Sequence, residues 1–146
     1  MSDPKKASIL RLMEECFNQH NLDIHPEFYS EDFVQHTPAL GDLQRPEHRE
    51  LLASTFAAFP DARWAVLDQI GERDKVVTRW TFAGTHRGTF MGIAPTEKQL
   101  VFSGICIDRF ADAKIVEEWE EWDTLGMMQQ LGVVPVETSV GDMVAP

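Results

Sequence analysis

The segment Ile115–Gly132 (IVEEWEEWDTLGMMQQLG) carries the side chains with the most evident chemistry. Alternation along an extended strand puts Trp119, Glu121 and Asp123 on one face. An aromatic neighbour desolvates a carboxylate and a second carboxylate repels its charge, so both effects raise a carboxyl pKa toward the range that a proton shuttle at neutral pH requires. We therefore predict that Asp123 is an acid–base group in an internal pocket, tuned by Glu121 and walled by Trp119.

The other charges of this segment have a simpler interpretation. Charge runs usually form a solvated face or protect an edge strand, and we expect this of Glu117, Glu118 and Glu120. Asp123 has a second interpretation as well, because an aspartate just before Thr124 is a good helix cap. Both roles of Asp123 stay open at this point.

Two further side chains are candidates for positioning a substrate. His36 stands in the short extended piece Val34–Thr37, where a neutral imidazole would orient a carboxylate or bind a substrate carbonyl, or else tie down the loop that follows. Arg79 lies on the strand face opposite to Trp80. Facing inward, Arg79 would pair with Asp123 or hold an enolate; facing outward, it would be a solvated cation.

The remaining histidines and the missing motifs bear on cofactors. His86 lies between Gly84 and Gly88 and is a candidate substrate-binding residue, with a structural role as the alternative. None of the five histidines has the spacing of a metal-ligand pair, and His20, His25 and His48 are expected at the surface or the core edge. The sequence contains no glycine-rich phosphate loop, nucleophile elbow or zinc motif. We therefore expect no metal and no cofactor, and chemistry by general acids and bases.

Apolar spacing divides the chain into a helical first part and a β-rich second part. Asp3 as an N-cap and Pro4 at the first helical position predict a helix that ends near Asn21. Other helices are expected over 23–29, 46–59 and 125–131, with an extended piece at 33–37 and a loop at 39–45. Antiparallel strands are expected over 62–72, 76–90, 98–110 and 114–122. This order is typical of an α+β fold whose helices lie on one face of a strongly curved sheet.

Length and composition limit the classes of protein. The 146 residues fit one domain, which we place at 1–133 with a C-terminal tail at 134–146. The net charge of −11 would repel nucleic-acid phosphates and anionic lipids, so neither a nucleic acid nor a membrane is an expected partner. No apolar run reaches the length of a membrane span and no signal peptide is evident, which favours a cytoplasmic protein. Cys16 and Cys106 lie far apart and are expected to be reduced core thiols.

The chain resembles a known family over about residues 8–133. The run RFADAKIVEEWEEWDTLGMMQQLG carries the pattern W-x-x-x-D-x-L-G-x-x-x-Q-L-G, and VVTRWTFAGTHRGTFMG and FYSEDFVQHTP precede it. These residues resemble the SnoaL-like polyketide cyclases, also called ester cyclases, of the nuclear transport factor-like superfamily. The resemblance implies a cone-shaped α+β barrel with an internal pocket, cofactor-free intramolecular aldol ring closure, and the acid–base role for Asp123.

Two turns depart from the family pattern. Pro95-Thr96-Glu97-Lys98 stands where the family usually has P-T-G-K, and Asp112-Ala113-Lys114 stands where it has D-G-K. If those turns need a positive φ, each non-glycine residue costs about 1 kcal/mol. The departures therefore concern local turn geometry.

The leading hypothesis is a SnoaL-like cyclase that acts on a planar polyketide or a similar β-dicarbonyl compound. Asp123 would remove an acidic C–H proton and return a proton to the aldol oxygen, while His36 and Arg79 position the substrate or its oxyanion. One alternative is a limonene-epoxide hydrolase-like enzyme, which would use an Asp–Arg–Asp set, although Thr81 occupies the position of the second aspartate. The other alternative is a non-catalytic ligand-binding or dimerisation domain.

Self-association as a homodimer is also expected. Meander sheets in this superfamily leave one convex face with exposed apolar residues, for which Val101, Ile105 and Ile107, or the side chains opposite to them, are candidates. Dimers are the commonest closed assembly.

Overall fold

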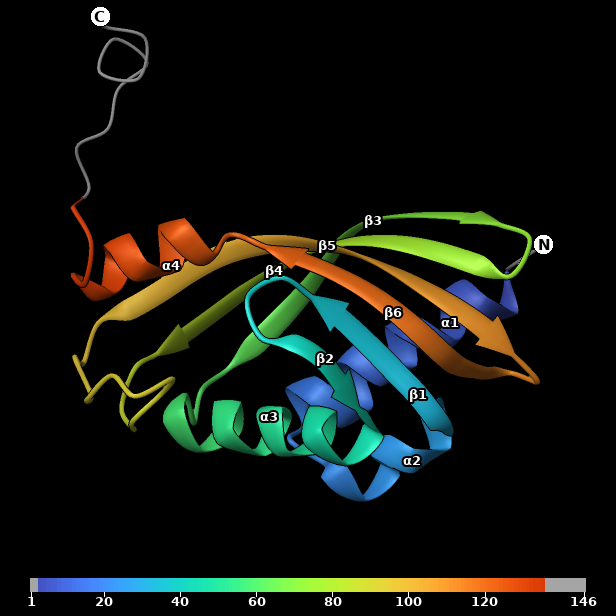
Figure 1. Ribbon diagram of the computed structural model, residues 1–146, viewed down its shortest axis with the longest axis horizontal. Coiled ribbons are helices and arrows are strands. Elements are labelled where there is room, and N and C mark those ends of the chain that lie inside the picture. The colour runs from blue at the N-terminus through green and yellow to red at the C-terminus, as the bar shows by residue number, and fades with distance from the viewer. Residues whose placement is uncertain (1–2, 136–146) are drawn as a thin grey trace, which may run out of the picture.

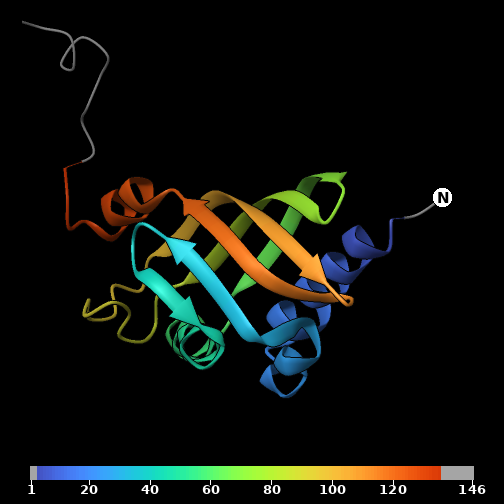
Figure 2. The same ribbon diagram turned by 45° about the vertical axis from the view of Figure 1, so that its right-hand side comes forward.

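Six strands form one mixed sheet in the computed structural model, which describes residues 3–135. The strands are β1 (Tyr29–Thr37), β2 (Gly41–Gln44), β3 (Arg63–Glu72), β4 (Lys75–Thr85), β5 (Gln99–Ala111) and β6 (Lys114–Trp122). Their order across the sheet is β2-β1-β6-β5-β4-β3. β1 and β6 run parallel, as their arrows show in Figure 2, and all other neighbours are antiparallel.

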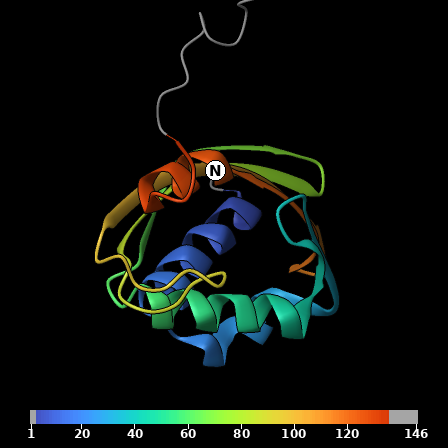
Figure 3. The same ribbon diagram turned by 60° about the vertical axis from the view of Figure 1, so that its left-hand side comes forward.

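Helices cover the concave face of this sheet. They are α1 (Pro4–Arg11), the π-helical η1 (Leu12–Asn18), the short 3₁₀ segment η2 (Leu22–Ile24), α2 (His25–Phe28) and α3 (Arg45–Ala58), whereas α4 (Thr124–Leu131) follows β6. The sheet arches over α1 and α3, which close its open side (Figures 1 and 3). This arrangement confirms the expected α+β fold, with N-terminal helices packed on a curved sheet.

Local signals in the sequence start and end several of these elements. The Asp3 side chain accepts a hydrogen bond from the Lys5 amide at 2.9 Å, so the predicted N-cap of the first helix is confirmed. Gly132 ends α4 in the left-handed conformation, with φ of 82°. Buried and exposed side chains alternate along β4, as a strand between a core and solvent requires.

The last helix continues along a free edge of β5. β6 pairs with β5 only from Gly104 onward, which leaves the backbone of Val101 without a strand on that side. The Gln130 side chain takes that place, since its amide accepts from the Val101 N–H and donates to the Val101 carbonyl, each at 2.8 Å. Gln130 is the glutamine of the W-x-x-x-D-x-L-G-x-x-x-Q-L-G pattern, and it thus satisfies the backbone hydrogen bonds of Val101 at the edge of the sheet.

Two strand boundaries and one strand differ from the prediction. β1 begins earlier, at Tyr29, and β2 lies inside the segment expected to be a loop. β4 ends at Thr85 and not near residue 90, because the chain that follows is held against the end of α3. The amides of Arg87 and Gly88 both donate to the carbonyl of Ala58, at 2.8 and 3.1 Å. These bonds leave the following residues in an irregular loop between β4 and β5.

The two turns that depart from the family pattern do require positive φ. Glu97 has φ of 61° and Ala113 has φ of 67°, and Asp112 beside it has φ of 50°. The backbone therefore adopts there the conformation that glycine favours, without glycine.

Cys16 and Cys106 are buried and unpaired, as expected of reduced core thiols. No helix in the described part of the chain has the length and apolar character that crossing a membrane requires. Most of the tail expected at 134–146 lies outside the described residues.

Candidate active site

A cavity of about 130 Å³ lies between the inner face of the sheet and helices α1, η1 and α3. Its walls are mainly apolar, and its aromatic side chains are Phe17, Tyr29, Phe59, Trp64, Trp80, Phe82, Phe90, Phe102 and Trp122. The most exposed lining residue is Met91, at 39%, so the cavity opens beside the loop between β4 and β5. The internal pocket implied by the family resemblance is therefore present.

Three carboxyl side chains, which we call the carboxyl cluster, meet in the half of the cavity away from this opening. Asp108 on β5 faces Glu118 on β6 across the two strands, and Glu120 follows on the same face of β6. Asp108 is in register with Val76 at the start of β4, whereas the loop that carries Met91 follows the other end of β4. Asp108 is 2% exposed and Glu118 6% exposed, so the cluster is largely removed from water.

Hydrogen bonds distinguish a base from an acid within this cluster. Gln35 Nε2 donates to Glu118 Oε1 at 2.6 Å, which favours the ionised carboxylate. Asp108 lies opposite Glu118 on the neighbouring strand, and its pKa is raised well above the ordinary value, first by burial and then by the charge of Glu118. Asp108 therefore favours its protonated form and places a proton donor beside the Glu118 carboxyl group.

Glu120 is a second acid of the cluster. Burial raises its pKa well above the ordinary value, and the charge of Glu118 adds to this. Tyr29 lines the same cavity, and its pKa is also raised well above the ordinary value by burial, with further contributions from Glu118 and Asp108. Groups that favour their protonated forms thus lie around the Glu118 carboxyl group.

A pair of histidines lies beside the carboxyl cluster but carries no charge. His48 lines the cavity, and its Nδ1 lies 2.9 Å from Nε2 of His25. Burial lowers the pKa of His48 to about 3 and that of His25 to about 4, so both rings are neutral at neutral pH. Their expected position at the surface or core edge is wrong, because both are buried. Within residues 3–135, no lysine or arginine lines the cavity.

One set of side chains has the spacing of metal ligands. Cys106, Asp108 and Glu118 each bring one potential ligand atom within 4.8 Å of the others. The Cys106 thiol already donates to Oδ2 of Asp108 at 3.6 Å, and burial favours the protonated form of Asp108 opposite Glu118. Proton sharing therefore accounts for their spacing.

Asp123 lies outside the cavity, so its predicted internal placement is wrong. Its side chain is exposed, and its Oδ1 accepts a 2.9 Å hydrogen bond from the Gly126 amide as the N-cap of α4. Glu121 and Arg79 are exposed as well, and with Asp123 they line an open hollow on the outer face of the sheet. The helix-cap interpretation of Asp123 is confirmed, and its role in catalysis stays a prediction.

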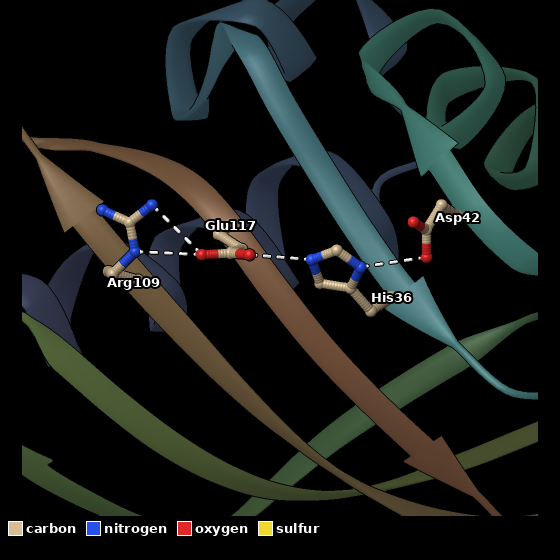
Figure 4. A network of polar contacts seen from close by, with 4 residues as sticks. All are labelled: His36, Asp42, Arg109 and Glu117. Carbon is tan, nitrogen blue, oxygen red and sulfur yellow. Dashed lines mark hydrogen bonds and ion pairs between the residues drawn. The ribbon is translucent and has the colours of Figure 1, made fainter.

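Figure 4 shows the network that holds His36 on the same outer face. Its Nδ1 lies 2.9 Å from Oδ1 of Asp42, and its Nε2 lies 2.7 Å from Oε2 of Glu117. Oε1 of Glu117 accepts from Nε and Nη2 of Arg109, both at 3.1 Å. Hydrogen bonds to Asp42 and Glu117 raise the pKa of His36, because the protonated ring donates to both. His36 thus joins β2 to β6 across β1.

Trp119 belongs to this outer surface as well. Its ring centroid lies 5.7 Å from that of His36, and the Lys75 ammonium lies 5.6 Å from the centroid of the indole. Trp119 therefore forms no wall of the cavity. The neighbours of His36 in sequence, Gln35 and Thr37, line the cavity instead.

His86 is fully buried at the base of the loop between β4 and β5. Its Nδ1 accepts from the Thr96 amide at 3.2 Å, and its ring stacks on Phe59 with centroids 5.5 Å apart. Its backbone bonds to Lys98 and Glu97 on the returning side of the loop. These contacts support the structural interpretation of His86, which is not among the residues that line the cavity.

The carboxyl cluster was missed by sequence reasoning, although a signal for it was present. The alternation along β6 was predicted correctly, but the face with Glu118 was expected in solvent. Asp108 lies between Cys106 and Phe110 at two-residue spacing, so a core-facing strand carries a carboxyl group. A buried carboxyl group requires a polar partner on an adjacent strand, and Glu118 provides it.

Comparison with known proteins identifies the family. The model of the SnoaL-like polyketide cyclase family matches residues 7–131. No functionally curated protein sequence matches significantly.

Solved structures resemble the chain over nearly its whole length. AclR from Streptomyces galilaeus, a candidate hydroxylase, is 29% identical with a TM-score of 0.81, and the match covers 90% of this chain and 97% of AclR. IdmH from Streptomyces antibioticus, a candidate polyketide cyclase, is 31% identical with a TM-score of 0.77, over 88% of this chain and 98% of IdmH. TsrD from Streptomyces laurentii is 25% identical with a TM-score of 0.79, over 92% of this chain and 100% of TsrD. The chain belongs to the SnoaL-like polyketide cyclase family.

Proposed function

We propose that this protein is an enzyme that moves protons on a small, largely apolar substrate by means of its carboxyl cluster, in a cofactor-free ring closure of aldol type. The observation that carries the proposal is the gathering of three carboxyl groups, Asp108, Glu118 and Glu120, in an aromatic cavity, where Gln35 donates to Glu118 and burial favours the protonated forms of Asp108 and Glu120. Family membership and the similarity to IdmH support a polyketide-like substrate.

The reaction needs one base and one acid on the same substrate. The Glu118 carboxylate removes a proton from a carbon between two carbonyl groups, and conjugation spreads the charge of the enolate. The enolate carbon attacks a second carbonyl carbon of the same molecule, which forms the C–C bond and leaves an alkoxide. Asp108 or Glu120 gives its proton to the alkoxide. The proton on Glu118 then passes to the emptied carboxylate, so the site regains its starting protonation.

The cavity favours this chemistry through its shape and low polarity. The stacked rings of Phe82 and Phe102, with centroids 4.7 Å apart, and the nearby Trp122 provide flat apolar surfaces for a planar substrate. Exclusion of water strengthens the electrostatic contacts between the substrate and the carboxyl groups.

The structure argues against the epoxide hydrolase-like alternative and is compatible with the non-catalytic one. An epoxide hydrolase-like set would use Arg79 and Asp123, but both lie on the outer face, and no arginine reaches the cavity in the described chain. A non-catalytic binding domain would use the same cavity without proton transfer. Kinetics of cavity variants therefore separate it from an enzyme.

The decisive variants replace carboxyl groups by amides of the same shape. On a neutral substrate, Glu118→Gln should lower turnover by roughly 10²–10⁴ while the affinity for that substrate changes little. Glu117→Gln is the matched control, because it alters the adjacent residue on the opposite face of β6. Turnover is followed on any β-diketone polyketide that the wild type cyclises, and C–H proton exchange on the same compound is followed by NMR in deuterated water.

Asp123→Asn decides whether Glu118 or Asp123 is the acid–base group. Asparagine caps a helix as well as aspartate, so the fold is kept. The proposal predicts near wild-type turnover for Asp123→Asn. Loss of turnover in Asp123→Asn together with retention in Glu118→Gln would overturn the proposal and establish the role that the family resemblance implies for Asp123.

A further inference from the structure

We propose that the substrate carries a protonated amine, which binds with its ammonium group among the carboxyl cluster, Gln35 and Thr37. This inference rests on the proposed function, because it names the class of substrate for the same site. The apolar body of the substrate would extend from the cluster toward the opening at Met91.

The first argument is the charge of the cavity. Its ionisable lining residues are Tyr29 on β1, His48 on α3, Cys106 and Asp108 on β5, and Glu118 and Glu120 on β6. Each is neutral or negative at neutral pH, and His48 is neutral because burial lowers its pKa to about 3. A buried carboxylate is stable only with a charged or hydrogen-bonding partner. The described chain brings no cation to Glu118, and an ammonium ligand would supply one.

The second argument is a pair of buried side-chain oxygens without a hydrogen-bond partner. Gln35 is 5% exposed and Thr37 is 4% exposed; both line the cavity, and neither Oε1 of Gln35 nor Oγ1 of Thr37 has a partner among the described residues. Gln35 already uses its amide nitrogen on Glu118. Oε1 of Gln35 can only accept a hydrogen bond, so its partner must be a donor; an ammonium group brings three donors, and a ligand carbonyl brings none. The unpartnered oxygens therefore favour an amine.

The third argument is the aromatic surface beside the cluster. Trp80 and Glu120 line the same cavity, and Tyr29 lies close enough to Glu118 and Asp108 for their charges to shift its pKa. The faces of tryptophan and tyrosine rings attract organic cations. The negative net charge of the whole protein, −11, also draws cations toward it.

Amine binding has a proton-release signature that also serves the reaction. A cation beside the cluster favours ionisation of Asp108 or Glu120, so a proton leaves the protein when the amine binds. One carboxylate then balances the ammonium group and another remains free as the base. Affinity for the amine should rise with pH until the amine itself loses its proton. Tyr29 and Cys106 stay protonated over this range because burial raises their pKa values.

Three probes of the same shape test the proposal on the full chain. They are 2-naphthylmethylamine, 2-naphthalenemethanol and 2-naphthoate, which are cationic, neutral and anionic near neutral pH. Calorimetry should give the amine at least about tenfold higher affinity than the alcohol, and the weakest binding for the acid. The heat of amine binding should depend on the ionisation enthalpy of the buffer, which reports proton release. Equal affinity for amine and alcohol would overturn the proposal.

Variants of the carboxyl cluster test whether it causes the preference for the amine over the alcohol. Glu118→Gln should reduce the ratio of amine affinity to alcohol affinity, with Glu120→Gln as a second variant of the same kind. Glu117→Gln, which alters the opposite face, should leave that ratio unchanged. A ratio that survives both cavity variants would locate amine recognition elsewhere and contradict the proposal.

C–H exchange on a neutral diketone separates this inference from the proposed function. Equal binding of amine and alcohol with exchange that depends on Glu118 would refute the amine and keep acid–base catalysis. An amine preference that depends on Glu118, without any exchange, would keep the amine site and refute acid–base catalysis.

Discussion

Nε2 of His36 lies 2.7 Å from Oε2 of Glu117, and this bond joins β1 to β6, the parallel strands of the sheet. The same ring donates to Asp42 on β2, so one imidazolium connects three strands on the outer face. The inner face of the same two strands carries Gln35 and Glu118, which belong to the candidate active site. The network and the candidate active site therefore lie on opposite faces of the same strand pair.

The His36 network should make stability depend on pH. The pKa of His36 is raised in the folded protein, so its stabilising contribution is complete below the unfolded value of about 6.5 and is lost as the pH rises through the folded value. The pKa of Glu117 is lowered, so its contribution is lost as the pH falls through its folded value, below about 4.3. Urea unfolding of wild type and His36→Asn should differ most near about pH 5.5 and least near about pH 9.

Glu121→Gln is the control for that experiment, because Glu121 lies on the same face and makes no ion pair with the described residues. Its effect should not follow this pH trend. A difference between wild type and His36→Asn that stays constant across the range would contradict the charged network.

The cap on α4 should distinguish two substitutions of Asp123. Asp123→Ala removes the acceptor for the Gly126 amide and should lower the free energy of unfolding by about 1 kcal/mol. Asp123→Asn keeps an acceptor and should stay close to wild type. Urea unfolding measures both, and an equal loss in the two variants would argue against the cap.

Gly104 should be needed for the position of Trp80. A Cβ on Gly104 would overlap the Trp80 indole and lie 2.9 Å from the carbonyl oxygen of Glu121. Gly104→Ala should therefore destabilise the protein by about 1–3 kcal/mol and move the indole away from Glu120. Tryptophan fluorescence and naphthyl ligand affinity report the movement. Ser103→Ala, one residue earlier on the outer face, serves as the control. A Gly104→Ala variant with the stability, fluorescence and ligand affinity of wild type would contradict the prediction and show that the indole has room for the added methyl group.

Self-association should involve the outer face of β5. Val101 is 56% exposed and Ile105 is 47% exposed, and Arg79 and Glu121 flank Ile105 on the two neighbouring strands. Two copies that meet antiparallel across this face would bury the apolar side chains and pair opposite charges. Light scattering at micromolar concentration should give a dimer mass for wild type and a monomer mass for Ile105→Glu.

Leu125→Glu is the control for that measurement, since Leu125 is 61% exposed on α4, away from the sheet face. A monomeric wild type would refute the dimer. Equal dissociation by the two variants would argue for a different interface.

Features that depend on nearby residues were predictable from the sequence. The first helix starts at Asp3 and Pro4, and the last ends at Gly132, because caps and left-handed residues act within one turn. The sharing of one face by Glu117, Trp119 and Glu121 also follows from the sequence, since alternation is a property of the extended backbone alone.

Features that depend on distant residues were not predictable. The loop after β4 departs from the strand because Arg87 and Gly88 bond to Ala58, which belongs to another element. The alternation along β6 left open which of its faces would turn inward. That choice came from the neighbouring strands, where Gln35 and Asp108 form the polar partners that Glu118 needs in order to be buried. The sequence by itself determined the elements and their faces, and only the tertiary structure decided which carboxyl groups lie in the cavity, because burial depends on contacts between segments far apart in the chain.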